Sequence, residues 1–408
     1  AIYYAGIAIN GFGQNALMRY ADGQWEAFDS LNGPINSVVK HRDTLFVGGA
    51  FDYAPGTTSH AVEFYDGVSW KPYGEFENAG VVRMLKVLED TLYAVGSFTS
   101  IDGVVCEGVA KRVGGAWMPV GSFPNDDQVL VDIVNYRDTL VVIGYVTFNS
   151  GRGIAYLDQD GYWKLLGPGI LGSLSGAHTL AVYQNKLYVG GQISLVAGNP
   201  GQEIMRWNGS GFEGLGQGLQ FSENNTTSFC DVRAMVEHDD LLFVGGGCNY
   251  AGGLPSHGVA VWDGVRWCSV PGHPNQSEGV LGMDFYRDTL FITSGHLVDG
   301  DTVNLAAKFV GGSYIDSCGA PVHIGEYIVL DKGKELSWSD QHDGTALVQG
   351  LPRGILPYTI FDAMGGFIEQ GMLSSDAVSP VRVRIPPSAT GLYLFQVGTQ
   401  VVHFVITR

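Results

Sequence analysis

Short hydrophobic runs that end in small residues recur along the first three quarters of the chain. Each run is followed by a second apolar segment, a turn that contains glycine, and an aromatic residue that repeats every 45 to 55 residues. The runs begin at Ile2, Leu45, Leu92, Leu140, Leu187, Leu242 and Leu290, and the aromatics are Trp25, Trp70, Trp117, Trp163, Phe212, Trp267 and Tyr314. A repeat of this length with short β-type segments is typical of four-stranded propeller units and not of helical solenoids.

Within each repeat, the polar and apolar positions predict four strands, which we name A to D. In the second repeat, strand A covers Ile35–Lys40, a polar turn follows, and strand B is the LFVGG run. An Asp-Gly or Asn-Gly turn then joins strand C to strand D, which carries the aromatic. Glycine pairs such as Gly48-Gly49 are expected where a side chain would obstruct the next backbone. The fold predicted for residues 1–326 is an all-β, seven-bladed β-propeller.

Two aromatics five residues apart follow the glycine pair in three of the repeats. They are Tyr65 and Trp70, Trp207 and Phe212, and Trp262 and Trp267. This motif resembles Kelch-like propeller repeats. Val113 and Asp158 stand at the first aromatic position in two other repeats. The repeat therefore resembles a relative of the Kelch pattern and not a member of it. The resemblance covers about 310 residues, and it implies a fold but little about function.

The first repeat begins at strand B, without a strand A before it. The segment Val322–Gly325 follows the last aromatic at about the distance where another strand A is due. We therefore expect Val322–Gly325 to lie beside Ile2–Gly6, which would cover both exposed edges of the ring.

The repeat ends near Tyr327, and a different β pattern fills residues 327–408. Val381, Val383 and Ile385 alternate with arginines, as in a half-buried strand. Further apolar segments end the chain, separated by Gly-Gly and Pro-Pro pairs. About 80 residues of short strands predict a small C-terminal β-sandwich.

Three segments of this tail resemble the type A C-terminal sorting domain of the bacterial type IX secretion system. They are IFDAMGGFIEQG (360–371), TGLYLFQV (390–397) and the closing VVHFVITR. The family's frequent Pro-Asn-Pro opening is missing from YIVLDKGKEL, and an Ig-like accessory sandwich is the alternative. The resemblance implies recognition by the outer-membrane secretion machinery, through a surface shaped by Asp362, Gly365, Gly391 and Tyr393. It also implies a secreted or cell-surface location, on the exterior of the outer membrane.

Charge and hydropathy limit the classes of partner that we expect for this chain. The formal net charge is −18, which disfavours nucleic acids and anionic membrane surfaces as ligands because both need basic patches. No apolar stretch approaches 18 residues, so we expect no transmembrane segment. A chain that begins at Ala1 fits removal of a signal peptide.

The five cysteines lack the CxxC or His/Cys spacing of zinc and redox sites, so we expect neither a metal nor a cofactor. If Val236 faces Leu242 in the A–B hairpin, Cys230 lies opposite Cys248, and a disulfide is predicted there. Two buried free thiols are the alternative. Cys268 and Cys318 follow strand-D aromatics in consecutive repeats and are candidates for a second bridge, which would leave Cys106 unpaired.

Two short segments resemble enzyme motifs, but neither meets the requirements of its motif. Gly11-Phe-Gly13-Gln-Asn-Ala16 matches the dinucleotide fingerprint but joins two predicted strands, without the helix that would hold a pyrophosphate. Gly172-Ser-Leu-Ser175-Gly176 misplaces the serine of a nucleophile elbow. No residue is predicted to be catalytic, and we do not expect an enzyme.

Binding has a firmer basis, because the long B–C and D–A connections of a propeller share one face. Residues in these connections form the candidate ligand face: Tyr53, Phe148, Phe221, Tyr250 and His257. Each aromatic has an alternative role in packing its own loop, and His257 has one in turn hydrogen bonding. The preferred hypothesis is an exported binding protein whose propeller engages a macromolecule or glycan. The alternatives are a glycan hydrolase or lyase on a propeller scaffold, and a structural component of a surface assembly.

Overall fold

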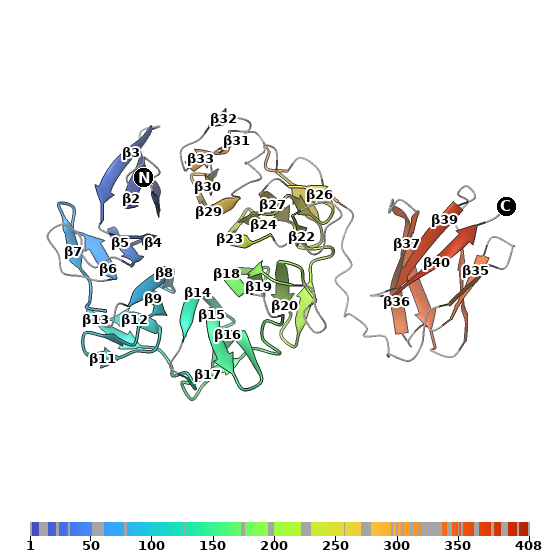
Figure 1. Ribbon diagram of the computed structural model, residues 1–408, viewed down its shortest axis with the longest axis horizontal. Helices are drawn as coiled ribbons and strands as arrows, with labels where there is room; N and C mark the ends of the chain where they lie inside the picture. Colours follow the sequence, from blue (N-terminus) through green and yellow to red (C-terminus); the bar gives the residue numbers. More distant parts are fainter. Residues whose placement is uncertain are drawn as a thin grey trace. The chain divides into compact units, whose positions relative to one another are not determined.

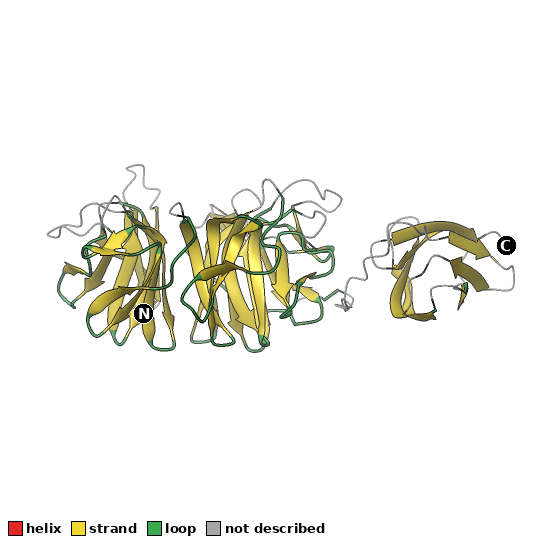
Figure 2. Ribbon diagram, turned by 90° about the horizontal axis from the view of Figure 1, so that it is seen from below, coloured by secondary structure: helices red, strands yellow, loops and turns green. Residues whose placement is uncertain are grey.

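The computed structural model shows strands and loops, and the described residues contain no helix (Figures 1 and 2). It describes residues 2–406 except 8–14, 22–23, 32, 51–60, 77–79, 126–127, 173–175, 195–199, 222–229, 257, 271–278, 295–296, 299–300, 303–305, 311–312, 316–317, 320–336, 341–344, 350, 352–353, 363–366, 377–378, 385–390 and 398–399. The predicted all-β fold is confirmed. Within this part of the chain, no helix is long and apolar enough to cross a membrane.

The chain forms two compact units, Ala1–Val322 (unit 1) and His323–Arg408 (unit 2). The boundary predicted after residue 326 falls among residues that the structure does not describe.

Unit 1 contains seven successive antiparallel sheets among its described residues. Most have the predicted order A-B-C-D, with each strand hydrogen-bonded to the next. In chain order the sheets are β1(Ile2–Ile7)-β2(Asn15–Ala21)-β3(Gln24–Ser30); β4(Ile35–His41)-β5(Thr44–Gly49)-β6(Val62–Tyr65)-β7(Trp70–Pro72); β8(Val81–Leu88)-β9(Thr91–Ser97)-β12(Val109–Val113)-β13(Ala116–Pro119); β14(Val129–Tyr136)-β15(Thr139–Phe148)-β16(Gly151–Leu157)-β17(Trp163–Leu165); β18(Gly176–Tyr183)-β19(Lys186–Gln192)-β20(Ile204–Trp207)-β21(Phe212–Gly214); β23(Val232–His238)-β24(Leu241–Gly246)-β27(Val259–Trp262)-β28(Trp267–Ser269); and β29(Val280–Tyr286)-β30(Thr289–Ser294)-β33(Ala306–Lys308).

Short hairpins lie in three of the connections between strands B and C. They are β10(Ser100–Ile101)-β11(Val104–Val105), β25(Tyr250–Ala251)-β26(Leu254–Pro255) and β31(Leu297–Val298)-β32(Asp301–Thr302). The second of these also pairs with β22(Leu219–Gln220), which precedes the sixth sheet.

The apolar cores of unit 1 lie between neighbouring sheets. Val95 and Val109 of the third sheet, for example, pack with Leu130 and Ile133 of the fourth. The A strands face the middle of unit 1 and the D strands face outward (Figure 1). The last sheet also touches the first: Tyr20 on β2 accepts a hydrogen bond from Lys308 Nζ at 3.0 Å. A succession of sheets whose last member meets its first leaves few open edges.

The recurring tryptophan of strand D has a physical explanation. Trp117, Trp163 and Trp267 are all buried. Each donates its indole N–H to a backbone carbonyl that precedes its own sheet, with lengths of 2.6, 2.9 and 2.8 Å. A large apolar ring with one donor therefore fills the junction between two sheets and satisfies a carbonyl there.

The glycine pair of strand B reflects a bulge that recurs in strand A. In each of the six described A strands, the register shifts by one residue near the start of the strand. A Cβ on Gly246 would lie 2.0 Å from the carbonyl oxygen of Asp231, and one on Gly96 would lie 1.9 Å from that of Val81. The first glycine of the pair faces the next sheet instead, because a Cβ on Gly245 would lie 2.9 Å from Val280 Cγ1. The first position is therefore obstructed by a side chain of the next sheet, and the second by backbone of its own sheet, whereas the expected obstruction was by the next backbone.

Polar residues stabilise two kinds of turn, those between strands A and B and those between strands C and D. All six A–B turns place two consecutive non-glycine residues at positive φ, as Arg42 (48°) and Asp43 (65°) do, which is the conformation of a two-residue type I′ hairpin. In four of the C–D turns, the side chain of Asp66, Asp158, Asn208 or Asp263 accepts the N–H groups that follow it. Asp66 Oδ1, for example, accepts from Val68 N and Ser69 N at 2.8 and 2.7 Å. These local bonds explain why Asp-Gly and Asn-Gly sequences mark the turns.

The described residues of unit 2 form two antiparallel sheets. The first is β34(Ser337–Asp340)-β35(Thr345–Gln349)-β38(Val381–Arg384), and the second is β37(Phe367–Ser375)-β36(Gly354–Asp362)-β39(Gly391–Val397)-β40(Gln400–Ile406). Both bury apolar side chains: Val348 and Val383 in the first, and Ile360 and Phe395 in the second. The β segments predicted from alternation are therefore strands.

The expected pairing of Val322–Gly325 with Ile2–Gly6 lies outside the described residues, and it stays a prediction. Among the described strands, β1 pairs with β2 alone. Cys318, shortly before that segment, pairs with Cys268 on β28.

Candidate functional site

The predicted disulfide between Cys230 and Cys248 is confirmed, with the two Cα atoms 5.0 Å apart. The register used to predict it was wrong near the turn, because Val236 pairs with Phe243 and not with Leu242. The hairpin turns on Asp239 and Asp240, so pairs near the turn sum to 479. The extra residue of the bulge between Val232 and Ala234 lowers this sum by one, so Val232 faces Gly246 with the predicted sum of 478.

The second candidate bridge, Cys268–Cys318, is also present. Cys106 is the free cysteine, and it is buried. Its thiol donates to the carbonyl of Val109 at 3.1 Å, and burial raises its pKa to about 12. A thiol that stays protonated is a poor nucleophile, so Cys106 is a packing residue.

The candidate ligand-face residues do not form one cluster. Tyr53 and His257 lie outside the described residues. Tyr250 on β25 pairs with Gln220 of β22, and Phe221 follows with 43% of its surface exposed. The carbonyl of Phe221 accepts a hydrogen bond from the Asn249 side chain at 2.9 Å. Phe148 lies at the end of β15 in the fourth sheet.

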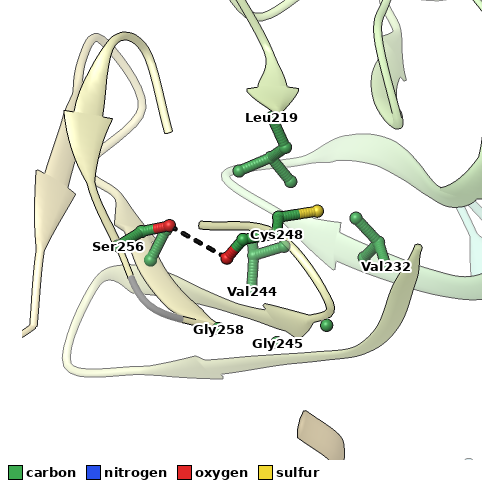
Figure 3. A pocket seen from close by; sticks show the side chains of 9 residues that line it. Leu219, Val232, Val244, Gly245, Cys248, Ser256 and Gly258 are labelled. Carbon is green, nitrogen blue, oxygen red and sulfur yellow. Dashed lines mark hydrogen bonds between the residues drawn. The ribbon is translucent and has the colours of Figure 1, made fainter. Parts of the chain in front are cut away.

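The surroundings of the first disulfide are filled. Leu219, Val232 and Val244 converge beside Cys248, and Ser256 Oγ donates to the carbonyl of Cys248 at 3.3 Å (Figure 3). The space between these side chains is too small for a water molecule. The disulfide therefore anchors a packed loop and does not border a ligand cavity.

Phe148 lines an open hollow of about 340 Å³ at the end of the fourth sheet. Its walls are Thr147, Phe148, Gly151, Arg152, Ile170, Leu171 and Gly172. Phe148 is half-buried and packs against the core between the third and fourth sheets, so it combines the packing role with an exposed surface. A volume of this size falls within the range of small-ligand sites.

Glycines let the backbone form this hollow. A Cβ on Gly151 would lie 2.7 Å from the carbonyl oxygen of Pro168, and one on Gly169 would lie 2.5 Å from that of Arg152. Gly169 has a φ of +76°, and Arg152 donates from its guanidinium to the carbonyl of Gly172. The D–A connection is therefore held tightly against the start of β16, with the arginine at the border of the hollow.

A group of ionisable residues joins the fifth and sixth sheets at the bulged ends of their A strands. His178 Nδ1 lies 2.6 Å from Asp231 Oδ1, and Arg233 pairs with the other oxygen of Asp231. His178 and Arg233 are the extra residues of the bulges in β18 and β23. None of these three residues was among the predicted site residues, since a register shift of one residue does not alter the apolar pattern.

Glu203 adjoins this group but is closed off from solvent. Its φ is +62°, at a position where the third and sixth sheets have Gly108 and Gly258. Glu203 is 1% exposed, and its carboxylate accepts the N–H groups of Ile193 at 2.7 Å and Cys230 at 3.3 Å. Burial raises its pKa to about 8, and the charge of Asp231 adds to this effect. Both oxygens serve the backbone, so Glu203 is not placed to act on a ligand.

Glu203 is expected to make the protein less stable as the pH rises from about 4.5 to 8. The folded protein keeps the proton over this range while the unfolded chain releases it, so the free energy of unfolding falls with pH. The expected difference is a few kcal/mol. Urea unfolding at several pH values should show this slope in the native protein and a flatter one in Glu203→Gln. An identical slope in both proteins would contradict the assignment.

The residues predicted for sorting are partly brought together. Asp362 at the end of β36 pairs with Tyr393 on β39, and Gly391 begins the same strand and pairs with Ile406. Gly365 lies outside the described residues. No group of three or more His, Cys, Asp or Glu residues in the described part of the chain has the arrangement of a metal site.

Comparisons with known proteins give no family. No family model matches the chain. No curated protein matches it either. Among solved structures, the chain is similar to the crystal structure of the computationally designed Ika8 protein, with 13% identity over 92% of this chain and 98% of that one. The TM-score is 0.41, too low to support any argument about fold or function.

Proposed function

We propose that unit 1 is a seven-bladed β-propeller that serves as the ligand-binding module of an exported protein. Seven successive antiparallel sheets support the architecture, together with the contact of Lys308 in the last sheet with Tyr20 in the first. Each sheet would be one blade, and the A strands would surround the central axis. The resemblance to Kelch-like repeats agrees with this arrangement.

The hollow at Phe148 is the observation that carries the binding function. An aromatic ring, an arginine and an apolar wall border an open space at the ends of strands B and C. Such a combination suits a sugar, whose apolar ring face stacks on an aromatic while its polar groups receive hydrogen bonds. The proposed ligand is a glycan, free or carried by a larger molecule.

An array of purified glycans tests this function. We expect the full chain to bind a restricted set of glycans, and the double variant Phe148→Leu, Arg152→Gln to lose at least tenfold in affinity for them. Tyr162→Leu is the matched control, since Tyr162 is an exposed aromatic away from the hollow. Binding that survives in the double variant, or no binding at all, would refute the function. Cleavage of a bound glycan would instead favour the enzyme alternative.

We further propose that unit 2 directs export through the type IX secretion machinery. The support is the resemblance of its last 50 residues to type A sorting domains and the pairing of Asp362 with Tyr393. In a host that has this machinery, a chain without residues 327–408 should accumulate in the periplasm. Normal export of that chain would refute the role.

The proposed location is the exterior of the outer membrane. Two disulfides, and the lack of a membrane-spanning helix among the described residues, are compatible with an extracellular location. Disulfides persist in oxidising compartments and are rare in the cytosol.

A further inference from the structure

The bulges of the A strands place six side chains at equivalent positions of unit 1. The extra residues are Asn36, Arg83, Val131, His178, Arg233 and Leu281, on β4, β8, β14, β18, β23 and β29. Two of them reach the next sheet: Asn36 donates to the carbonyl of Val82 at 3.0 Å, and His178 contacts Asp231. At these two bulges, the extra residue therefore connects neighbouring sheets.

None of these six residues is acidic, although Asp and Glu outnumber Lys and Arg by 41 to 23 in the chain. The other ends of the same strands have the opposite character. The twelve residues of the six A–B turns include seven acids, Asp43, Glu89, Asp90, Asp138, Asp239, Asp240 and Asp288, against three arginines. The extra residues of the bulges are thus basic or neutral while the turns are mostly acidic, although Asp132 and Asp231 lie beside two of the bulges.

Arginine charge at the bulged ends is only partly neutralised. Arg83 is exposed, and neither Arg83 nor Arg152 forms an ion pair with any described residue. Asp231 is the one carboxylate paired with the bulge residues in the described part of the chain, and it serves both His178 and Arg233. Arg152 borders the hollow, and Arg83 lies on β8 of the neighbouring sheet. In an acidic protein, arginines without an ion pair among the described residues favour an anionic ligand.

The hollow lies at the same end of the fourth sheet as the bulge of β14. Leu130, beside that bulge, pairs with Gly144, and β15 continues from there to Phe148. Phe148 and Ile170 line the hollow together with Arg152.

We propose that this surface binds an acidic polysaccharide, with uronate carboxylates on Arg83 and Arg152 and a sugar ring against Phe148. The inference rests on the proposed glycan-binding function and specifies its ligand class. A planar guanidinium binds a carboxylate with two parallel hydrogen bonds. An acidic peptide would use the arginines equally but would gain nothing specific from an open aromatic wall, whereas a sugar ring stacks on it.

Isothermal titration with an octamer of galacturonic acid tests the ligand class. We expect the full chain to bind the octamer, and to bind its methyl ester at least tenfold more weakly because the ester lacks the carboxylate charge. The double variant Arg83→Gln, Arg152→Gln should lose at least tenfold in affinity for the acid. The control Arg287→Gln removes one charge from an A–B turn and should leave binding unchanged; circular dichroism verifies that all variants fold.

Three results would overturn the inference. Equal binding of acid and ester would mean that the carboxylate charge does not contribute to recognition. The glycan-binding function would then stand without this inference. Octaglutamate binding as tight as that of the octamer would assign the surface to acidic peptides. Absence of octamer binding would exclude uronates, and the glycan array would then decide separately whether any glycan binds.

Discussion

Gly246→Ala should lower the free energy of unfolding of unit 1 by about 3 kcal/mol or more. The added Cβ would lie 2.0 Å from the carbonyl oxygen of Asp231 and 3.0 Å from the Cα of Val232. Both are backbone atoms of the paired strand, so no side chain can rotate to make room. The bulge of β23 would have to separate from β24, breaking hydrogen bonds beside the Cys230–Cys248 disulfide.

The adjacent residue provides the matched control. A Cβ on Gly247 meets no atom within 4 Å, and Gly247 is not among the described glycines at positive φ. Gly247→Ala should therefore change the stability by less than about 1 kcal/mol. Urea unfolding followed by tryptophan fluorescence reports on unit 1, which holds seven of the eight tryptophans. Similar effects of the two substitutions would show that the carbonyl contact does not determine the glycine.

Removal of the Cys230–Cys248 bridge in the double variant Cys230→Ala, Cys248→Ala should destabilise unit 1 by about 3 kcal/mol. The bridge joins cysteines 18 positions apart, and it limits the conformations of the unfolded chain while holding the start of β23 to the end of β24. Unfolding by urea measures the difference.

Cys106→Ala is the control for this pair, because it removes a buried sulfur without removing a cross-link. Its expected effect is about 1 kcal/mol, the loss of one small buried group. Thiol counting under denaturing, non-reducing conditions should give one free thiol in the native chain. A count of three or five would contradict one or both bridges.

The repeated strands of unit 1 were predictable because each type of strand recurs several times with a similar sequence. The LFVGG-type runs lie on B strands such as β5 and β24, and the strand-D tryptophans occupy equivalent buried junctions. A single strand with this pattern would have been ambiguous. Repetition fixed the hairpin partners, and with them the approximate register that placed Cys230 opposite Cys248.

Features that depend on a single inserted residue could not be predicted from the sequence. The bulge in each A strand adds a single residue, so the apolar pattern continues without a visible break. The two-residue turn at Asp239 and Asp240 displaced Val236 by one position, and the bulge restored the predicted register at Val232. The bulges also hid the alignment of Arg83, His178 and Arg233. Glu203 was not predicted for a related reason, because its equivalence to Gly108 and Gly258 is visible only in backbone hydrogen bonds.

The candidate site was found only in part. Phe148 was singled out as an aromatic in a connection, yet the hollow beside it depends on Gly151 and Gly169, whose close contacts are with backbone carbonyls. Arg152 had no distinguishing neighbour in the sequence. A cavity arises from segments that meet in space, and a pattern of strands specifies which segments meet but not the space left between them.

The Cys268–Cys318 disulfide determines how the molecule responds to cutting and to pulling. Strands β29, β30 and β33 all lie between the two bridged cysteines. A protease that cleaves once between them would leave a single covalent molecule, and unit 2 would stay attached. Tension applied through unit 2 would enter unit 1 at Cys318 and pass through the sulfur–sulfur bond to β28. The last sheet would then be shielded from the load.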